Sequence, residues 1–367
     1  MPRVSPTDLE RFYREAFIAE RTTPAAAEAG AAGLLYADLH GIDTHGAANL
    51  DRVYLAKIRC GEIDAAAKPQ VVVDTDAVAL IDAHRCLGFL PASKGMELAV
   101  AKAGRFGIGA VAVRNSTHCG ALGYYSSLAA KADCVGIGFT NLGSEVHLRP
   151  PNGRRNLLGT NVIAAGSPAG EAPRFNLDMS VAAIAVSRIR AAHRRGEQIP
   201  PGWLCDESGR EVTDPADFAK GAAFLQFLDG RNTPGGYKGY GLAILIDILC
   251  GVLSGGCVGP TRKNLEEGAV RPEHPGVGHF FLALDVRAFR PTGDFHPAMD
   301  ELLNCLVDCP PASQREKVRY PGLRQQTAAA DRQTHGIPVD AVTHEGLLNI
   351  GRRHNIAPPS VMEARLA

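Results

Sequence analysis

Two histidines on polar turns are the residues of this chain best suited to acid–base chemistry. His118 lies in the turn 115–120 (NSTHCG), directly after the apolar run 108–113, and His45 lies in the turn 43–46 (DTHG). Imidazole has an unperturbed pKa that lets it give and take protons near neutrality. Either histidine alone could simply hold a turn by hydrogen bonds, but two such turns in one chain favour an enzyme.

Three other features could serve such a site. Asp178 precedes an expected helix and could be its N-cap or could orient an imidazole, and its position in the sequence does not choose between these roles. The Gly-rich stretch 235–241 with Lys238 opens an apolar helix, which suits a carboxylate or phosphate but equally describes a plain turn. The basic turn 319–324 could bind phosphate or be solvated.

Several common catalytic motifs are absent from the sequence. It has no Gly-x-Gly-x-x-Gly between a strand and a helix, which disfavours a Rossmann domain. It also lacks a Walker phosphate loop, the His-Glu-x-x-His pattern of zinc sites and the Gly-x-Ser-x-Gly elbow of serine hydrolases. We therefore expect no metal in the site.

Composition excludes some classes of protein. The 39 basic and 39 acidic residues balance, so no overall charge favours nucleic acid or an anionic membrane. No apolar stretch approaches the roughly 20 residues that cross a bilayer, and the N-terminal residues lack an apolar signal core. Nine cysteines without a Cys-x-x-Cys pair are typical of thiols in a reducing cytoplasm.

The spacing of apolar residues predicts the elements that must position these side chains. Caps, prolines and helical periodicity predict helices, and short β-branched runs bounded by Asp, Gly and Lys predict strands. Expected helices cover about 6–19, 24–39, 50–59, 91–104, 179–195, 240–253 (buried by its composition), 297–306 and 340–350. Expected strands cover 71–73, 77–81, 108–113, 135–140 and 279–286. Helices on either side of a strand-rich middle indicate an α+β arrangement.

Taken in order, the motifs of this chain resemble the malate/L-lactate dehydrogenase family that lacks a Rossmann fold. That family includes ureidoglycolate and sulfolactate dehydrogenases and the reductases of piperideine- and pyrroline-2-carboxylate. The matching segments run through nearly the whole chain: 43–46 (DTHG), 115–120 (NSTHCG), 158–161 (LGTN), 178–180 (DMS), 199–203 (IPPGW), 236–243 (GYKGYGLA), 278–283 (GHFFLA) and 336–340 (GIPVD).

The resemblance implies a fold, a cofactor and a reaction. It implies a largely antiparallel central sheet over residues 71–309 that binds NAD or NADP. It also implies a helical region in which residues 1–70 pack with residues 310–367. The implied chemistry is reversible hydride transfer to or from a 2-oxo acid, a 2-hydroxy acid or a cyclic 2-imino acid. The implied assembly is a cytoplasmic homodimer with a small-molecule substrate.

The resemblance also assigns roles to individual residues. His45 would be the proton donor with Thr44 and Asp178 as its relay, although some members assign the acid–base role to the position of His118. Thr160 would touch the substrate. The residues that would hold the dinucleotide are His118, Cys119, Gly120, Ala121, Leu122, Ser167, Pro168, Lys238, Arg319, Pro321, Gly322 and Arg324.

The chain departs from the family pattern at the substrate end. Thr44 replaces a serine, and Leu323 replaces a glutamate. Asn49 stands where members carry an arginine that fixes the substrate carboxylate, and an amide cannot form that charge-assisted bidentate clamp. The chain is also one residue longer than the usual pattern before Tyr54.

These departures predict an NAD(P)-dependent reductase with a non-standard substrate, in a specialised biosynthetic pathway. One alternative is an ordinary 2-oxo or 2-imino acid reductase in which Arg52 replaces the lost clamp. A second alternative is a non-catalytic family member that keeps the dinucleotide site. The retention of the two histidines, Thr44 and Asp178 argues against that second alternative.

Overall fold

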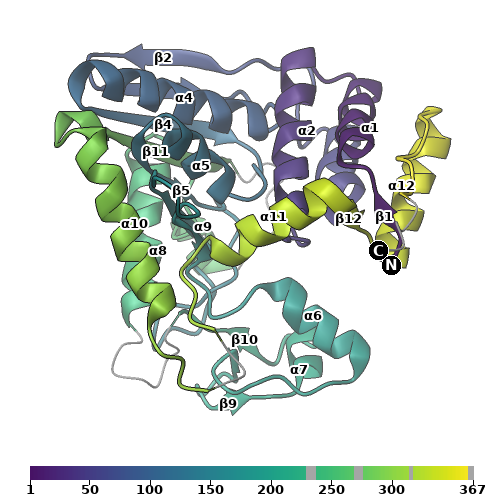
Figure 1. The fold of residues 1–367 in the computed structure, drawn as a ribbon. Coiled ribbons are helices and arrows are strands. Elements are labelled where there is room, and N and C mark those ends of the chain that lie inside the picture. The colour runs from purple at the N-terminus through teal and green to yellow at the C-terminus, as the bar shows by residue number, and fades with distance from the viewer. Residues whose placement is uncertain (229–236, 268–275, 314–316, 363–367) are drawn as a thin grey trace. The chain divides into compact units, whose positions relative to one another are not determined.

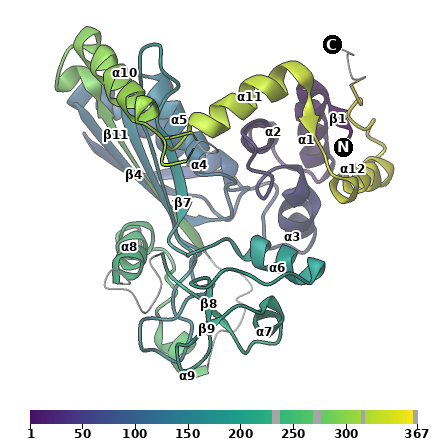
Figure 2. The same ribbon diagram turned by 60° about the horizontal axis from the view of Figure 1, so that its bottom comes forward.

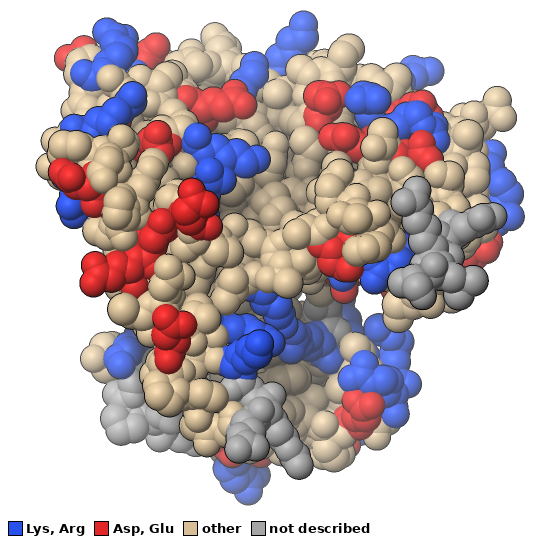
Figure 3. All heavy atoms as spheres, in the orientation of Figure 1, with Lys and Arg blue, Asp and Glu red and all other residues tan. Residues whose placement is uncertain are grey.

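The computed structural model describes residues 1–228, 237–267, 276–313 and 317–362 (Figure 1). The chain divides into two compact units. The first consists of Met1–Gly138, Ala164–Asp178 and Phe281–Ala367, and the second of Phe139–Ile163 and Met179–Phe280. None of the described helices is long and apolar enough to cross a membrane. Side chains of both charges occur across the face shown in Figure 3.

Local capping chemistry starts the first two helices of the first unit where the sequence predicts them. The Ser5 hydroxyl accepts a hydrogen bond from the Asp8 N–H at the start of α1 (Pro6–Ala19). The Thr23 hydroxyl does the same for the Ala26 N–H at the start of α2 (Pro24–Leu39). Each helix has proline in its first turn, where a missing N–H costs nothing. Gly41, with φ of 70°, follows α2.

The two ends of the chain share one hydrophobic core. Apolar side chains of α1, α2 and the segment 47–63 pack with those of the two-stranded sheet β1 (Arg3–Val4) and β12 (Ile337–Pro338) and of α12 (Ala341–His354). Figure 1 shows α1, α12, β1 and β12 side by side. This core supports the turn that carries His45.

A π-helix follows that turn. The helix expected over residues 50–59 is present, but its first part is the π-helix η2 (Leu50–Leu55), and only α3 (Ala56–Arg59) is α-helical. A π turn holds one residue more than an α turn does. A π-helix at this point is compatible with the extra residue expected before Tyr54, and Leu50, Tyr54 and Leu55 are buried.

Seven strands form the main sheet, in which the strands expected from the sequence are present. Their order is β2 (Gln70–Asp74), β3 (Val78–Asp82), β4 (Ile108–Ser116), β11 (Val277–Asp285), β5 (Cys134–Thr140), β6 (Val162–Gly166) and β7 (Asn176–Ser180). Figure 2 labels β4, β7 and β11 of this sheet. β2 pairs with β3 antiparallel, whereas β3 and β4 are parallel and are joined by α4 (Phe89–Phe106). The chain is therefore a mixture of helix and sheet. Close packing of α4 on β4 depends on Gly109, where a Cβ would lie 2.1 Å from the Ala99 carbonyl oxygen.

The first unit contains further helices outside the shared core. They are α5 (Gly123–Lys131), η4 (Val286–Ala288), α10 (Thr292–Asp308) and α11 (Leu323–His335). The sequence predicts α10 but not α5 or α11: α5 is only nine residues long, and α11 is a polar, Ala- and Gln-rich stretch with little apolar periodicity.

The second unit contains a small sheet and several short helices. The sheet has the order β10 (Phe224–Leu225), β8 (Leu204–Cys205), β9 (Glu211–Val212). The helices are α6 (Val186–Arg195), α7 (Pro215–Ala219), α8 (Tyr237–Asp247), the π-helix η3 (Ile248–Val252) and α9 (Arg262–Glu267).

Two sequence-based predictions are wrong in this part of the chain. The helix expected over 179–195 begins only at Val186, because residues 176–180 form the strand β7. The helix expected to be buried over 240–253 exposes much of its apolar surface, since the side chains of Ile244, Leu245, Ile248, Val252 and Leu253 are between 37% and 67% exposed. Apolar composition predicted the helix but not which of its faces is covered.

Candidate active site

The two histidines singled out in the sequence face each other in the first unit. Their rings are nearly parallel, with an interplanar angle of 19° and centroids 5.6 Å apart. The Thr44 hydroxyl lies 2.9 Å from Nδ1 of His45, as the resemblance implies for the pair. The surrounding protein lowers the pKa of His45, because burial disfavours the charged ring. His45 is therefore a neutral imidazole near neutrality and can accept a proton.

His118 follows the end of β4, and its tautomer is set by its neighbours. The Gly120 N–H donates to Nδ1 at 3.3 Å, and the Tyr54 hydroxyl lies 2.7 Å from the same nitrogen. A backbone N–H can only donate, so Nδ1 is an acceptor and the Tyr54 hydroxyl donates to it. Burial raises the pKa of Tyr54 and so keeps this hydroxyl protonated. The neutral ring of His118 consequently carries its proton on Nε2.

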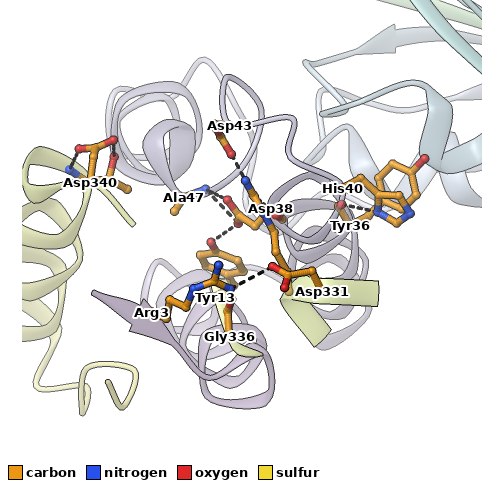
Figure 4. A network of polar contacts seen from close by, with 12 residues as sticks. Arg3, Tyr13, Tyr36, Asp38, His40, Asp43, Ala47, Asp331, Gly336 and Asp340 are labelled. Atoms are coloured by element: carbon orange, nitrogen blue, oxygen red, sulfur yellow. Dashed lines mark hydrogen bonds and ion pairs between the residues drawn. The ribbon is translucent and has the colours of Figure 1, made fainter. Parts of the chain in front are cut away.

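A buried carboxyl of α2 holds the turn that carries His45. Both oxygens of Asp38 accept from the Ala47 N–H, at 3.0 and 3.1 Å, and Oδ2 also accepts from the Tyr13 hydroxyl (Figure 4). Burial raises the pKa of Asp38 to about 7, against the opposing effect of these bonds. A Cβ on Gly46 would collide with the carboxyl, so glycine is required there.

An arginine of α11 fixes the same segment from the other side. Arg332 donates from Nη1 to the Asp38 carbonyl oxygen at 2.5 Å and to the Asp43 carboxylate at 3.0 Å. Sequence reasoning missed Asp38, Tyr13 and Arg332. For Asp38 the sequence offered one signal, an acidic side chain within the Ala-rich helix expected over 24–39.

Asn49, which replaces the expected arginine, uses its amide within the chain. This buried side chain donates from Nδ2 to the Thr44 carbonyl oxygen at 2.6 Å. Its Oδ1 accepts from Nη2 of Arg52 at 3.0 Å, and the Arg52 side chain is exposed. Asn49 thus links Arg52 to the turn that carries Thr44 and His45.

Asp178 lies in β7 and is not the N-cap of the helix that follows it in sequence. Its Oδ2 accepts from the Gly123 N–H at 2.7 Å, and its carboxyl also accepts from the Leu122 N–H, both at the start of α5. Within the described residues no hydrogen bond joins Asp178 to His45. Part of the side chain reaches solvent, yet the surrounding protein desolvates the carboxyl and raises its pKa to about 6. Asp178 therefore holds the end of the loop 118–122, which begins with the other histidine.

Two segments expected to bind the dinucleotide meet although about 150 residues separate them in sequence. The Tyr320 hydroxyl donates to the Pro173 carbonyl oxygen at 2.6 Å, and the Asn176 N–H donates to that of Pro321 at 3.0 Å. The turn of Arg319, Pro321, Gly322 and Arg324 therefore lies against the loop that follows Ser167 and Pro168.

Asn176, which sequence reasoning missed, connects this turn to the loop after His118. Its Nδ2 donates to the Gly123 carbonyl oxygen at 3.0 Å and to the Tyr36 hydroxyl at 2.8 Å, and its Oδ1 accepts from Ser126 at 2.8 Å. Asn176 thereby ties α2 and α5 together through its side chain, and the turn 319–324 through its backbone N–H. No local pattern marks such a residue, because all of these partners lie at least 50 residues away in sequence.

The residues gathered here fit a dinucleotide. Gly322, with φ of 100°, precedes α11, whose first turn has no side-chain cap, and a Cβ at this position would lie 2.7 Å from the Asn176 nitrogen. Exposed Arg319 and Arg324 flank this helix start. Backbone N–H groups at a helix N-terminus together with two arginines are a donor set for the pyrophosphate group. The side chains of Cys119, Ala121 and Leu122 are buried at the other end of this set.

Two predicted residues lie in the second unit. Lys238 is exposed in the first turn of α8, and Thr160 is half-buried just before β6. Gly235 and Gly236 of the predicted anion site lie outside the described residues. Among the residues that the structure describes, no three His, Cys, Asp or Glu side chains form a group able to hold a metal ion.

Comparisons with known proteins agree with the resemblance. The model of the malate/L-lactate dehydrogenase family matches residues 4–348. Malate dehydrogenase of Pyrococcus abyssi is 34% identical over 320 residues, which cover 87% of this chain and 86% of that protein. Delta(1)-pyrroline-2-carboxylate reductase of Ancylobacter novellus is 30% identical over 354 residues, covering 96% and 98%. The crystal structure of malate dehydrogenase from Entamoeba histolytica superposes with a TM-score of 0.90 at 28% identity, covering 98% of this chain and 99% of that one. The chain is an oxidoreductase that belongs to the malate/L-lactate dehydrogenase family.

Proposed function

We propose that this protein transfers hydride reversibly between NAD(P) and carbon 2 of a 2-oxo acid, 2-hydroxy acid or cyclic 2-imino acid. The observation that carries the proposal is the facing pair of His45 and His118 beside the loop 118–122. Relatives of this chain are named malate dehydrogenase, L-sulfolactate dehydrogenase and pyrroline-2-carboxylate reductase. All three names describe oxidation or reduction at a carbon next to a carboxylate.

The cofactor would lie along the loop 118–122, the loop after Ser167 and the turn 319–324. When bound, the nicotinamide supplies or accepts the hydride, and the protein supplies orientation and proton transfer. Asp178 and Asn176 fix the start of α5 and so the loop that would line the nicotinamide ring. Arg319 and Arg324 would hold the phosphates, and Lys238 of the second unit is a further proposed contact.

The hydrogen bonds of the two histidines support different roles. The Thr44 hydroxyl can accept from a protonated His45 ring and can donate to a neutral one, so this pair survives proton transfer. Nδ1 of His118 accepts from the Gly120 N–H, a bond that protonation of this nitrogen would break. We assign the acid–base role to His45. We assign to His118 the role of an Nε2–H donor that polarises the substrate oxygen or nitrogen.

The contacts of Asn49 favour Arg52 as the group that binds the substrate carboxylate. Asn49 uses both ends of its amide on Thr44 and Arg52, whereas the Arg52 guanidinium is exposed and is held by one bond to Asn49. Arg52 can form the bidentate pair that an amide cannot. With Arg52 as the clamp the substrate would be an ordinary 2-oxo or 2-imino acid, whereas without it we propose a non-standard substrate that lacks the clamped carboxylate. A role in a specialised biosynthetic pathway remains our proposal.

The remaining features of the proposal come from the family resemblance. We propose the family's own non-Rossmann, largely antiparallel sheet, a helical region built from residues 1–70 and 310–367, and a cytoplasmic homodimer. The shared core of α1, α2 and α12 supports the proposed helical region. Sedimentation of the purified protein tests the dimer, because a mass of one chain at micromolar concentration contradicts it.

Two experiments test the reaction. Titration with NADPH and NADH, followed by nicotinamide fluorescence, identifies the cofactor, and we expect Arg319→Ala to weaken binding. Assays with pyruvate, 2-oxoglutarate and pyrroline-2-carboxylate then compare Arg52→Met with the parent. We expect KM to rise at least tenfold with unchanged cofactor affinity, and Arg353→Met, an exposed arginine of α12, serves as control. An unchanged KM in Arg52→Met would exclude Arg52 as the clamp.

A further inference from the structure

A buried carboxyl in the second unit lacks a donor for one of its oxygens. Asp247, at the end of α8, is 5% exposed, and its neighbours Asn141 and Asn161 are fully buried. Asp247 Oδ1 accepts from Nδ2 of both amides at 3.1 Å. Among the described residues, Asp247 Oδ2 and Asn161 Oδ1 are buried and have no hydrogen-bond partner. A buried oxygen without a donor is unfavourable and calls for an explanation.

The other donors and acceptors of this cluster are fully used. Nδ2 of Asn161 also donates to the Ala243 carbonyl oxygen at 3.0 Å, and that of Asn141 to the Cys257 carbonyl oxygen at 3.0 Å. Oδ1 of Asn141 accepts from two backbone N–H groups. No amide hydrogen is therefore left for the two oxygens. A proton on Asp247 itself would satisfy both oxygens at once.

A carboxylic acid and a primary amide form a cyclic pair of two hydrogen bonds. One is N–H to the carboxyl oxygen, which the structure contains between Asn161 Nδ2 and Asp247 Oδ1. The other is O–H to the amide oxygen, and the two unpartnered atoms are the ones that this bond would join. We propose that Asp247 carries a proton on Oδ2 and donates it to Asn161 Oδ1, and that this pair positions the substrate-contacting turn of Thr160.

The electrostatic surroundings agree with a protonated carboxyl. Burial raises the pKa of Asp247 to about 6, while the two amide N–H bonds act in the opposite direction. Within the described chain no lysine or arginine forms an ion pair with Asp247. The titratable groups on the adjacent segments are the thiols of Cys250 and Cys257 and the ring of His279, whose Nδ1 bonds the Thr140 hydroxyl at 2.8 Å.

The pair acts on the turn 159–161 through its geometry. Asn161 Oδ1 sits against Gly159, where a Cβ would lie 2.6 Å from it, and the Asn161 carbonyl oxygen accepts from the Val181 N–H at 2.8 Å. Thr160 lies between these two anchored residues. The claim that the pair positions a substrate-contacting residue rests on the proposed function of Thr160. The claim that Asp247 and Asn161 form a protonated pair does not depend on that function. We describe Asp247 as a positioning residue.

Asp247→Asn tests the pair, because asparagine supplies a permanent N–H where the acid has a proton. In wild-type protein the neutral form is favoured on folding, so stability is greatest below the pKa of an unfolded Asp and falls as pH rises through about 6. The melting temperature of Asp247→Asn should therefore rise by a few degrees relative to wild type between about pH 4 and about pH 7. Glu207→Gln, which removes an exposed charge in the same unit, should parallel wild type.

Two further readouts separate this pair from a merely structural role. At about pH 5, below the pKa of Asp247, difference infrared spectroscopy should show a neutral carboxyl band in wild type that Asp247→Asn lacks. Asn161→Asp places two carboxyls together, so its melting temperature should depend on pH more steeply than that of wild type. Parallel melting curves for wild type and Asp247→Asn, or the same carboxyl band in both, would overturn the proposal. These measurements need no turnover, so they stand apart from the proposed reaction. A KM of Asp247→Asn that loses the wild type's pH dependence would establish the link to Thr160, and an unchanged dependence would break it.

Discussion

Replacing Tyr54 by phenylalanine tests the assignment of the two histidines. The change removes the hydroxyl that donates to His118 Nδ1 at 2.7 Å and leaves that nitrogen with the longer bond from Gly120 at 3.3 Å. The ring of Tyr54 stays packed against Phe89, with centroids 4.9 Å apart, so the fold is retained. We expect a less firmly held His118 and a lower kcat.

The size of the effect follows from the single bond that is lost. A buried neutral hydrogen bond contributes about 0.5–1.5 kcal/mol net, and about 1.4 kcal/mol corresponds to a tenfold change in rate. The kcat of Tyr54→Phe should therefore fall about two- to tenfold. Cofactor affinity should not change, because the segments that would hold the phosphates do not contact Tyr54. The pH dependence of kcat should also stay the same, since His45 and not His118 exchanges the proton.

The assay is the pH profile of kcat for wild type, Tyr54→Phe and Tyr240→Phe. Tyr240 is a matched control, since its ring packs edge-on against Phe227 in the second unit. No described contact joins Tyr240 to His45 or His118. A displaced limb of the profile in Tyr54→Phe would refute the assignment. It would show that the protonation of Nδ1 of His118, the nitrogen that Tyr54 touches, controls the rate.

Three further predictions concern the same unit. His45→Gln should lower kcat about 10²- to 10⁴-fold and remove the part of the pH profile of kcat that reports the titration of His45. Steady-state kinetics in which the pH profile keeps its wild-type shape would contradict this. Asp38→Asn should have a higher melting temperature than wild type at alkaline pH, because a pKa raised from 3.8 to about 7 disfavours the folded protein with an ionised Asp38 by about 4 kcal/mol. Calorimetry would disprove this if the difference in melting temperature between the two proteins stayed constant from about pH 4 to about pH 8. Gly123→Ala should weaken NADH binding severalfold in a fluorescence titration, because its Cβ would come within 3.2 Å of the Asp178 carboxyl, and unchanged binding would mean that this contact does not shape the loop.

Local chemistry explains the parts of the fold that sequence reasoning predicted. The starts of α1 and α2 depend on Ser5, Thr23 and the prolines beside them, all within a few residues of the bonds they make. The strand before His118 is likewise visible as an apolar run that ends in a polar turn. These signals can be recognised without any knowledge of distant contacts.

Residues whose partners are remote in sequence could not be assigned in this way. Asp178 has the residue type and local setting of a helix N-cap, and it does bond a helix start, but that helix begins 55 residues earlier at Gly123. Asn176 and Asp38 are unremarkable in sequence, and their importance comes from bonds to several separate elements. The replacement at Asn49 was visible as a departure, yet its partnership with Arg52 depends on the turn between them.

The π-helix at Leu50–Leu55 determines what a change of chain length does beside the site. In a regular α-helix one inserted residue rotates every later side chain by about 100°. A π turn can confine that rotation to itself, and in this π-helix Tyr54 bonds His118 while Leu55 is buried in the core. An insertion at this point thus moves a cation along the wall of the site without a penalty in the core. We therefore expect a variant with one residue inserted or deleted within 50–55 to change the position of the Arg52 guanidinium more than the packing of the core.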